Sequence, residues 1–189
     1  MNNKNNRGPQ FFVLITSLFL AIGLGCQHTD KSSKDSMDKT SRATAMAGGE
    51  SFTEIAFEPG KDTLTQSSRE KLRQFSNDIT AQGREIDEIK VLAWSDRSYP
   101  SSQQKASKQD IELADKRASS IEEFLEKDLN NRGDVDTFNM AKRPYRVSEI
   151  LRTDDYETKT LFERAGVASS EGELTSDKTS KAVIFVTYE

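Results

Sequence analysis

Two charged side chains lie where a predicted strand and the helix that follows it could bring them together. The strand covers residues 89–94 (IKVLAW), which are apolar or β-branched except for one lysine, and Asp96 comes just after its carboxyl end. Arg117 lies about two turns into the next predicted helix. A carboxylate at the end of a strand and a guanidinium on the following helix can share the mouth of one crevice.

The two predicted elements that position these charges have clear sequence patterns. The helix carries an apolar stripe with spacings of three and four, which is typical of a helix that packs on a core. Its members are Ile111, Ala114, Ala118, Ile121, Leu125 and Leu129. Residues 97–109 are polar and contain Pro100, so they are predicted to form a loop. Trp94 belongs to the apolar strand and is expected in the core.

Two short segments in this stretch resemble a known family. Ala93-Trp94-Ser95-Asp96 and residues 113–118 (LADKRA) are similar to the strand-end Thr-Asp and the helical Leu-Ser-x-x-Arg-Ala of OmpA-like peptidoglycan-binding domains. The order of predicted elements extends the resemblance over residues 52–188. The resemblance implies an α+β fold of βαβαβ-(α)-β order, with a mixed sheet and helices on one face.

The resemblance also implies a ligand, the diaminopimelate of peptidoglycan stem peptides, which ends in an ammonium and a carboxylate close together. Asp96 would accept hydrogen bonds from the ammonium, and Arg117 would bind the carboxylate through two parallel hydrogen bonds. Ser95, Asp110 and Lys181 are the other predicted binding residues. Taken singly, Asp96 could instead cap a turn, and Arg117 could pair with a glutamate on its own helix.

The chain departs from the family's pattern at three places. Asp110 stands where the family usually has asparagine, three positions before the motif leucine. Residues 180–182 (SKA) replace the Asn-Arg-Arg that precedes the family's last strand, which leaves Lys181 as the only basic residue there. The loop between Asp96 and the helix is also longer than in the family. These changes affect the residues around the predicted ligand.

The first 25 residues are predicted to be a secretory signal peptide. Lys4 and Arg7 precede a largely apolar stretch over residues 11–25, which is too short to span a membrane as a helix. Gly23-Leu24-Gly25-Cys26 resembles a bacterial lipobox, in which the cysteine is acylated after cleavage. We therefore expect a palmitate-bearing lipoprotein of the outer membrane, with its domain in the periplasm. The alternative is ordinary cleavage that leaves Cys26 free in a periplasmic protein.

The remaining residues divide into a linker and one folded domain. Residues 26–50, with the acylated Cys26, are polar and small, and they predict a disordered tether of roughly 27 Å r.m.s. span. Residues 51–189 form the predicted OmpA-like domain, in which 182–188 is the clearest strand and is expected at the centre of the sheet. The other expected elements are strands at 51–57 and 135–140 and helices at 64–82 and near 156–165.

Composition argues against several other functions. The chain has one histidine and one cysteine, and His28 lies in the predicted tether, so histidine-based catalysis and internal disulfides are excluded. No nucleotide-binding or metal-ligand motif occurs, and we expect no cofactor, no metal and no enzymatic activity. No basic run indicates nucleic acid as a partner. The leading prediction is a lipid-anchored protein that binds peptidoglycan; the alternative is a degenerate OmpA-like interaction module that binds envelope proteins.

Overall fold

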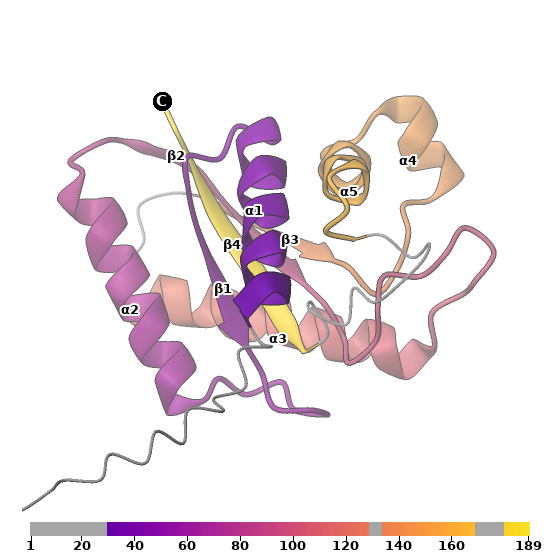
Figure 1. Ribbon diagram of the computed structural model, residues 1–189, viewed down its shortest axis with the longest axis horizontal. Helices are drawn as coiled ribbons and strands as arrows, with labels where there is room; N and C mark the ends of the chain where they lie inside the picture. The colour runs from indigo at the N-terminus through magenta and orange to yellow at the C-terminus, as the bar shows by residue number, and fades with distance from the viewer. Residues whose placement is uncertain (1–29, 129–133, 169–179) are drawn as a thin grey trace, which may run out of the picture.

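The computed structural model describes residues 30–128, 134–168 and 180–189, which form a four-stranded sheet with helices packed around it (Figure 1). The strands are β1 (Ser51–Ala56), β2 (Ile86–Ala93), β3 (Asp134–Asn139) and β4 (Lys181–Tyr188), in the order β1-β4-β2-β3. β4 is antiparallel to both of its neighbours, whereas β2 and β3 are parallel. The prediction of a mixed sheet with residues 182–188 at its centre is confirmed.

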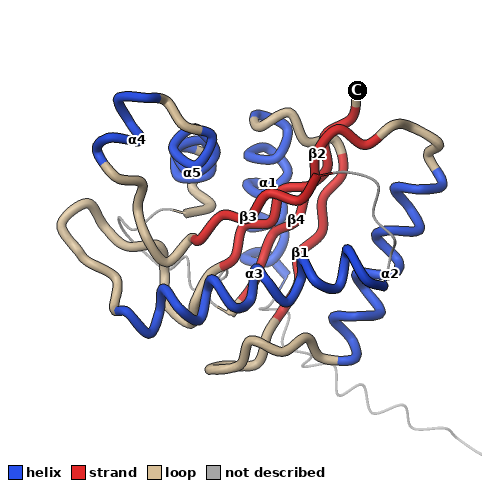
Figure 2. Tube along the Cα trace, turned by 180° about the vertical axis from the view of Figure 1, so that it is seen from behind, coloured by secondary structure: helices blue, strands red, loops and turns tan. Residues whose placement is uncertain are grey.

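Helices cover both faces of the sheet, and the prediction of helices on one face only is therefore wrong. α2 (Gln66–Ala81) and α3 (Lys108–Asp128) lie on one face, and α1 (Asp30–Met46) and α5 (Asp154–Arg164) lie on the other (Figures 1 and 2). The physical reason lies in the central strands. Alternate residues of β4 enter two separate hydrophobic clusters, with Ile184 and Val186 in one and Val183 and Phe185 in the other.

Helices α2 and α3 contribute seven of the sixteen buried residues of the first cluster. Their buried side chains are Leu72, Phe75, Ile79, Ala118, Ile121, Phe124 and Leu125. Thr65 caps α2, accepting a hydrogen bond from the Ser68 N–H at 3.1 Å. Trp94 is buried in the second cluster, as expected for a core residue.

The segment predicted as a disordered tether contains helix α1. Its carboxyl-terminal half packs on the sheet through small side chains, since Thr40, Ala43 and Thr44 are buried. The Thr40 hydroxyl donates a hydrogen bond to Glu54 of β1 at 3.1 Å, and Gly49 lies against Thr44 and Phe185. Close packing of small residues, rather than a large apolar stripe, stabilises this helix, and a composition-based prediction therefore missed it.

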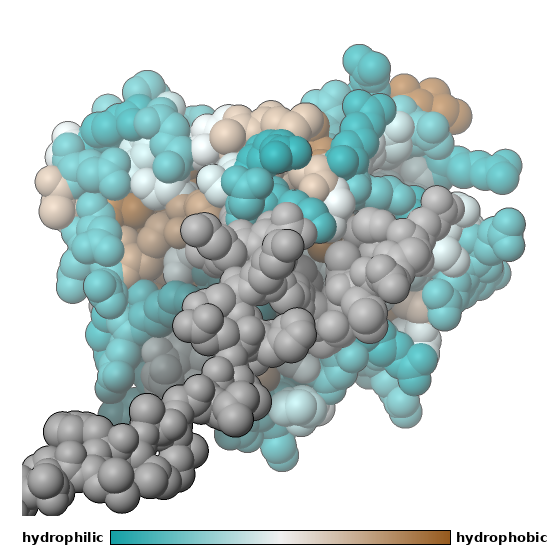
Figure 3. All heavy atoms as spheres, viewed as in Figure 1, coloured by the Kyte–Doolittle hydropathy of each residue, from teal (hydrophilic) through white to brown (hydrophobic). Residues whose placement is uncertain are grey.

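A short helix, α4 (Arg146–Leu151), was also missed by the sequence analysis. It precedes α5, which begins at Asp154 with Thr153 as its cap. Four large apolar side chains of this segment are exposed: Tyr145, Val147, Ile150 and Leu151. Figure 3 shows the corresponding apolar surface over α4, at the upper right of that view.

Several sequence predictions fall outside the described residues. They are the signal peptide, Cys26 and Leu129. Among the described residues, no helix combines the length and the apolar character that crossing a membrane requires.

Candidate functional site

An open pocket of about 550 Å³ lies at the carboxyl end of β2. Its walls are residues 95–100 and 104–107 of the loop after β2, together with Asp110 in the first turn of α3 and Ala141 after β3. Three of the predicted binding residues line it, namely Ser95, Asp96 and Asp110. The long polar loop after β2 therefore builds most of the pocket.

Arg117 forms an ion pair with Asp96, but it is buried and does not share the mouth of an open crevice with it as the sequence analysis expected. Its Nη2 lies 2.6 Å from Oδ1 of Asp96, and its side chain has no exposed surface. The same guanidinium donates to three backbone oxygens, those of Lys61 at 2.8 Å, Trp94 at 2.9 Å and Glu58 at 3.2 Å. Arg117 thus ties the loop after β1 to the end of β2, and it does not line the pocket.

The Asp96 carboxylate is surrounded by hydrogen-bond donors. Besides Arg117, it accepts hydrogen bonds from the Ser180 hydroxyl at 2.6 Å and from the backbone N–H of Gly60. Burial by itself would raise the pKa of Asp96, but the hydrogen bonds from Ser180, Arg117 and Gly60 outweigh it and lower that pKa below its ordinary value. Asp96 is therefore a fixed anion at the pocket wall.

The structure separates Lys181 from the other predicted binding residues. Lys181 lies beside Glu54 of β1, with 3.8 Å between Nζ and the carboxylate, and it is not part of the pocket wall. Its neighbour Ser180 contacts Asp96 instead, in a left-handed backbone conformation with φ of 58°. Sequence reasoning noted the triplet 180–182 but looked only for a basic residue, and so it missed the hydroxyl of Ser180.

Arg97 and Asp110 form a second acid–guanidinium pair, and both line the pocket. The Nε of Arg97 lies 3.5 Å from Oδ2 of Asp110. The Arg97 side chain is 76 % exposed, whereas that of Asp110 is 15 % exposed. Ser107 holds Asp110 in place: its hydroxyl donates to Oδ2 at 2.6 Å and accepts from the Asp110 N–H at 3.1 Å. Sequence reasoning did not single out Arg97, although it follows the predicted Asp96 directly.

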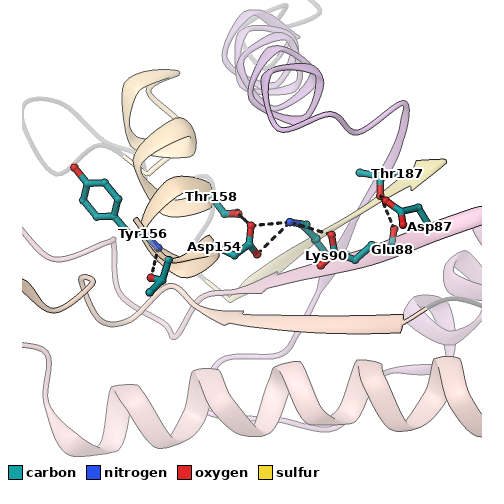
Figure 4. Close-up of polar contacts among 8 residues, drawn as sticks. Asp87, Glu88, Lys90, Asp154, Tyr156, Thr158 and Thr187 are labelled. Atoms are coloured by element: carbon teal, nitrogen blue, oxygen red, sulfur yellow. Dashed lines mark hydrogen bonds and ion pairs between the residues drawn. The ribbon is translucent and has the colours of Figure 1, made fainter. Parts of the chain in front are cut away.

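A cluster of acidic residues lies where α5 begins beside β2 and β3; there Glu88, Asp136 and Asp154 approach one another closely enough to hold a metal ion. Lys90 pairs with two members of this cluster. Its Nζ lies 2.9 Å from Asp154 and 3.0 Å from Glu88 (Figure 4). The ammonium supplies the positive charge that a metal would bring, so the cluster is best explained as an ion-pair network that fixes α5 to β2.

Residues 56–143 match the model of the OmpA family. Solved structures with a related backbone include the OmpA-like domain of FopA1 from Francisella tularensis, at 12 % identity and a TM-score of 0.43, with 72 % of each chain covered. The peptidoglycan-associated lipoprotein from Burkholderia pseudomallei has 10 % identity and a TM-score of 0.38, covering 72 % of this chain and 89 % of that one. The periplasmic domain of Helicobacter pylori MotB has 15 % identity and a TM-score of 0.41, covering 75 % and 84 %. No protein with a curated description matches the sequence.

Proposed function

We propose, from the match of residues 56–143 to the model of the OmpA family, that the protein is a non-catalytic module of the bacterial cell envelope that binds peptidoglycan. The open pocket at the end of β2 gives this proposal its main support, because it holds fixed acidic groups and exposed basic groups together. Such a pocket suits a small zwitterionic group.

The proposed ligand is the diaminopimelate side chain of a stem peptide. Its free ammonium would lie against the carboxylates of Asp96 and Asp110, near the backbone of Ser95. Arg117 would act from behind the wall, holding Asp96 in place, because its own donors are engaged with protein acceptors. Lys181 lies outside the pocket wall and is not part of this proposal. Charge-assisted hydrogen bonds contribute about 1.5–3 kcal/mol each, so a single ligand would bind weakly and the polymer would supply avidity.

We further propose that Cys26 is acylated and holds the chain to the outer membrane, with its domain in the periplasm. The lipobox-like sequence at residues 23–26 supports this step. Several acyl chains give durable attachment, since each buried methylene contributes about 0.8 kcal/mol. A mass shift at Cys26 and partition of the mature protein into detergent are the expected observations. A soluble mature protein with an unmodified Cys26 would contradict the anchor.

Sedimentation with insoluble peptidoglycan tests the binding function. The mature chain should sediment with diaminopimelate-type peptidoglycan, and free diaminopimelate should release it. Lysine-type peptidoglycan is the matched control, because lysine lacks the second carboxylate and should retain little protein. No soluble fragments should appear. A chain that stays in the supernatant with both polymers would refute the proposal.

The exposed apolar side chains of α4 favour a second candidate function, an interaction module for another envelope protein. Val147, Ile150 and Leu151 lie outside the family match and are more than 60 % exposed. Large exposed apolar groups in one place commonly mark interaction sites. A partner that still binds an Asp110→Asn variant but is lost from a Val147→Ser, Ile150→Ser variant would support this function.

A further inference from the structure

Helix α4 presents its apolar face to solvent instead of to the core. Val147, Ile150 and Leu151 are three and four positions apart, so they lie on one side of the helix. They are 63–79 % exposed, and no residue of α4 is buried. Tyr145, which precedes the helix, is 74 % exposed as well. We propose that these four side chains form a contact site for an anionic lipid surface.

The residues around this face are basic, although the chain as a whole is acidic. Residues 142–152 contain four basic residues and one acidic residue, whereas the chain has a net charge of −4. Arg146 and Arg152 stand at the two ends of the apolar face. Both are exposed, and neither has an ion-pair partner among the described residues. The one acid, Glu149, lies on the opposite side of the helix, because successive residues are about 100° apart.

The first two residues of α5 are acidic, but both are already paired with lysines. Asp154 lies 2.9 Å from Nζ of Lys90, and Asp155 lies 2.6 Å from Nζ of Lys159. Both lysines are buried. These two carboxylates therefore do not neutralise the arginines beside the apolar face, which stay available for the phosphates of lipid headgroups.

The size and position of this surface favour a membrane over the protein partner of the second candidate function. A specific protein interface buries about 800 Å² on each side and needs a complementary shape. Four side chains on and beside a helix of six residues cover only part of that area, and Figure 3 shows their surface at the edge of the molecule. A lipid surface needs no such fit, because apolar groups enter the acyl boundary while arginines bind phosphates.

The test measures vesicle binding by the mature chain with Cys26→Ser, which cannot be acylated, so that α4 is measured without the proposed anchor. Vesicles of phosphatidylethanolamine and phosphatidylglycerol supply the anionic surface, and phosphatidylcholine vesicles supply a neutral one. The chain should sediment with the anionic vesicles and bind the neutral ones at least about 10-fold more weakly. Added salt should weaken the binding.

A first variant removes the apolar contact. Val147→Ser, Ile150→Ser should bind anionic vesicles at least about 10-fold more weakly, because it removes two large apolar groups that would leave water. Met46→Ser is its control, since Met46 is also exposed but lies at the end of α1. The control should bind like the parent.

A second variant removes the charge. Arg146→Gln, Arg152→Asn should lose about fivefold in affinity for each arginine, and asparagine suits the left-handed backbone of residue 152. Lys108→Gln, Lys127→Gln is its control, because it removes two positive charges from exposed positions of α3. This control should bind within about twofold of the parent, because the lost charges lie far from the proposed contact.

Every substituted position is exposed, so urea midpoints close to that of the parent are expected. Sedimentation with peptidoglycan should be the same for all variants, which separates this inference from the proposed function. A parent chain that binds no anionic vesicle would overturn the inference, as would variants that bind as well as their controls. Self-association, or a protein partner, that is lost with Val147→Ser, Ile150→Ser in a chain that binds no vesicle would also overturn it and would favour protein docking.

Discussion

Replacement of Arg117 by alanine should destabilise the fold strongly, whatever it does to ligand binding. Arg117 joins the loop after β1, the end of β2 and the Asp96 carboxylate. Alanine at this position would leave the buried oxygen of Trp94 without its donor and the Asp96 charge without its partner. The prediction separates a structural role from a ligand-binding role for the same residue.

The size of the effect follows from the burial of each acceptor. Breaking a fully buried ion pair costs about 3–5 kcal/mol, but the Asp96 side chain is 32 % exposed and can regain water. The oxygens of Lys61 and Glu58 are only partly buried, whereas the bond to Trp94 is buried throughout and its loss adds about 1–2 kcal/mol. A total loss of about 3 kcal/mol is expected, or a decrease of about 10 °C in Tm.

Urea unfolding followed by Trp94 fluorescence measures this change directly. With an m-value of about 2 kcal/mol/M, the midpoint should fall by about 1.5 M. Lys116→Ala is the control, because it removes the same charge from an exposed neighbouring position of α3 and should change the free energy of unfolding by less than about 0.5 kcal/mol. An Arg117→Ala protein as stable as this control, yet unable to bind diaminopimelate, would show that Arg117 serves the ligand and that our reasoning is wrong.

Three further substitutions test other parts of the structure. Gly49→Ala should lower the free energy of unfolding by about 1–3 kcal/mol in urea, because the new methyl would lie 2.5 Å from Thr44 and 2.6 Å from Phe185. Gly83→Ala is the control: its methyl meets open space, and the loss should be only about 1 kcal/mol. Equal losses would contradict the packing of α1. Lys159→Met should be neutral or stabilising at pH 7, because burial lowers the pKa of Lys159 even though Asp155 lies 2.6 Å away. The parent protein should gain stability relative to this variant as the pH rises towards 10.5. A stability difference that stays constant with pH would refute the prediction. Asp96→Asn should be less stable than the parent at pH 7, because the folded state lowers the pKa of Asp96. The difference in stability should shrink as the pH falls below about 4. A difference that does not depend on pH would exclude the charged hydrogen bonds as its cause.

The sequence predicted those elements whose stability depends on large apolar side chains. The stripes of α2 and α3 and the β-branched run of β4 are visible in the sequence, and the order of these elements was sufficient to predict a mixed sheet. Helix α1 was missed because Thr40, Ala43 and Thr44 each bury little apolar area. Close packing of this kind depends on three-dimensional fit, which a periodicity search does not detect.

At the site, too, residue spacing in the sequence predicts which side chains lie near each other but not which of them are buried. A strand end followed by a helix was enough to predict that Asp96 and Arg117 lie near each other. It could not predict that the loop after β1 would cover the guanidinium with the oxygens of Glu58 and Lys61. Burial of a charge depends on backbone atoms contributed from elsewhere in the chain, and the identity of the residues there does not matter for such contacts. For the same reason, the open pair of Arg97 and Asp110 became visible only in the structure.

Helix α1 also changes the expected relation between the membrane anchor and the pocket. Thr40 meets Glu54 in the second half of β1, while Gly49 and the end of α1 lie near its start, so α1 runs antiparallel to β1. Its amino end therefore points towards the end of the sheet that carries the pocket (Figure 1). Only residues 27–29 separate Cys26 from Asp30, a link of at most about 14 Å, in place of the roughly 27 Å expected for a 24-residue coil. If Cys26 is acylated as proposed, the pocket would lie at short range from the membrane. The protein would then bind the peptidoglycan nearest the lipid surface, unless α1 first leaves the sheet.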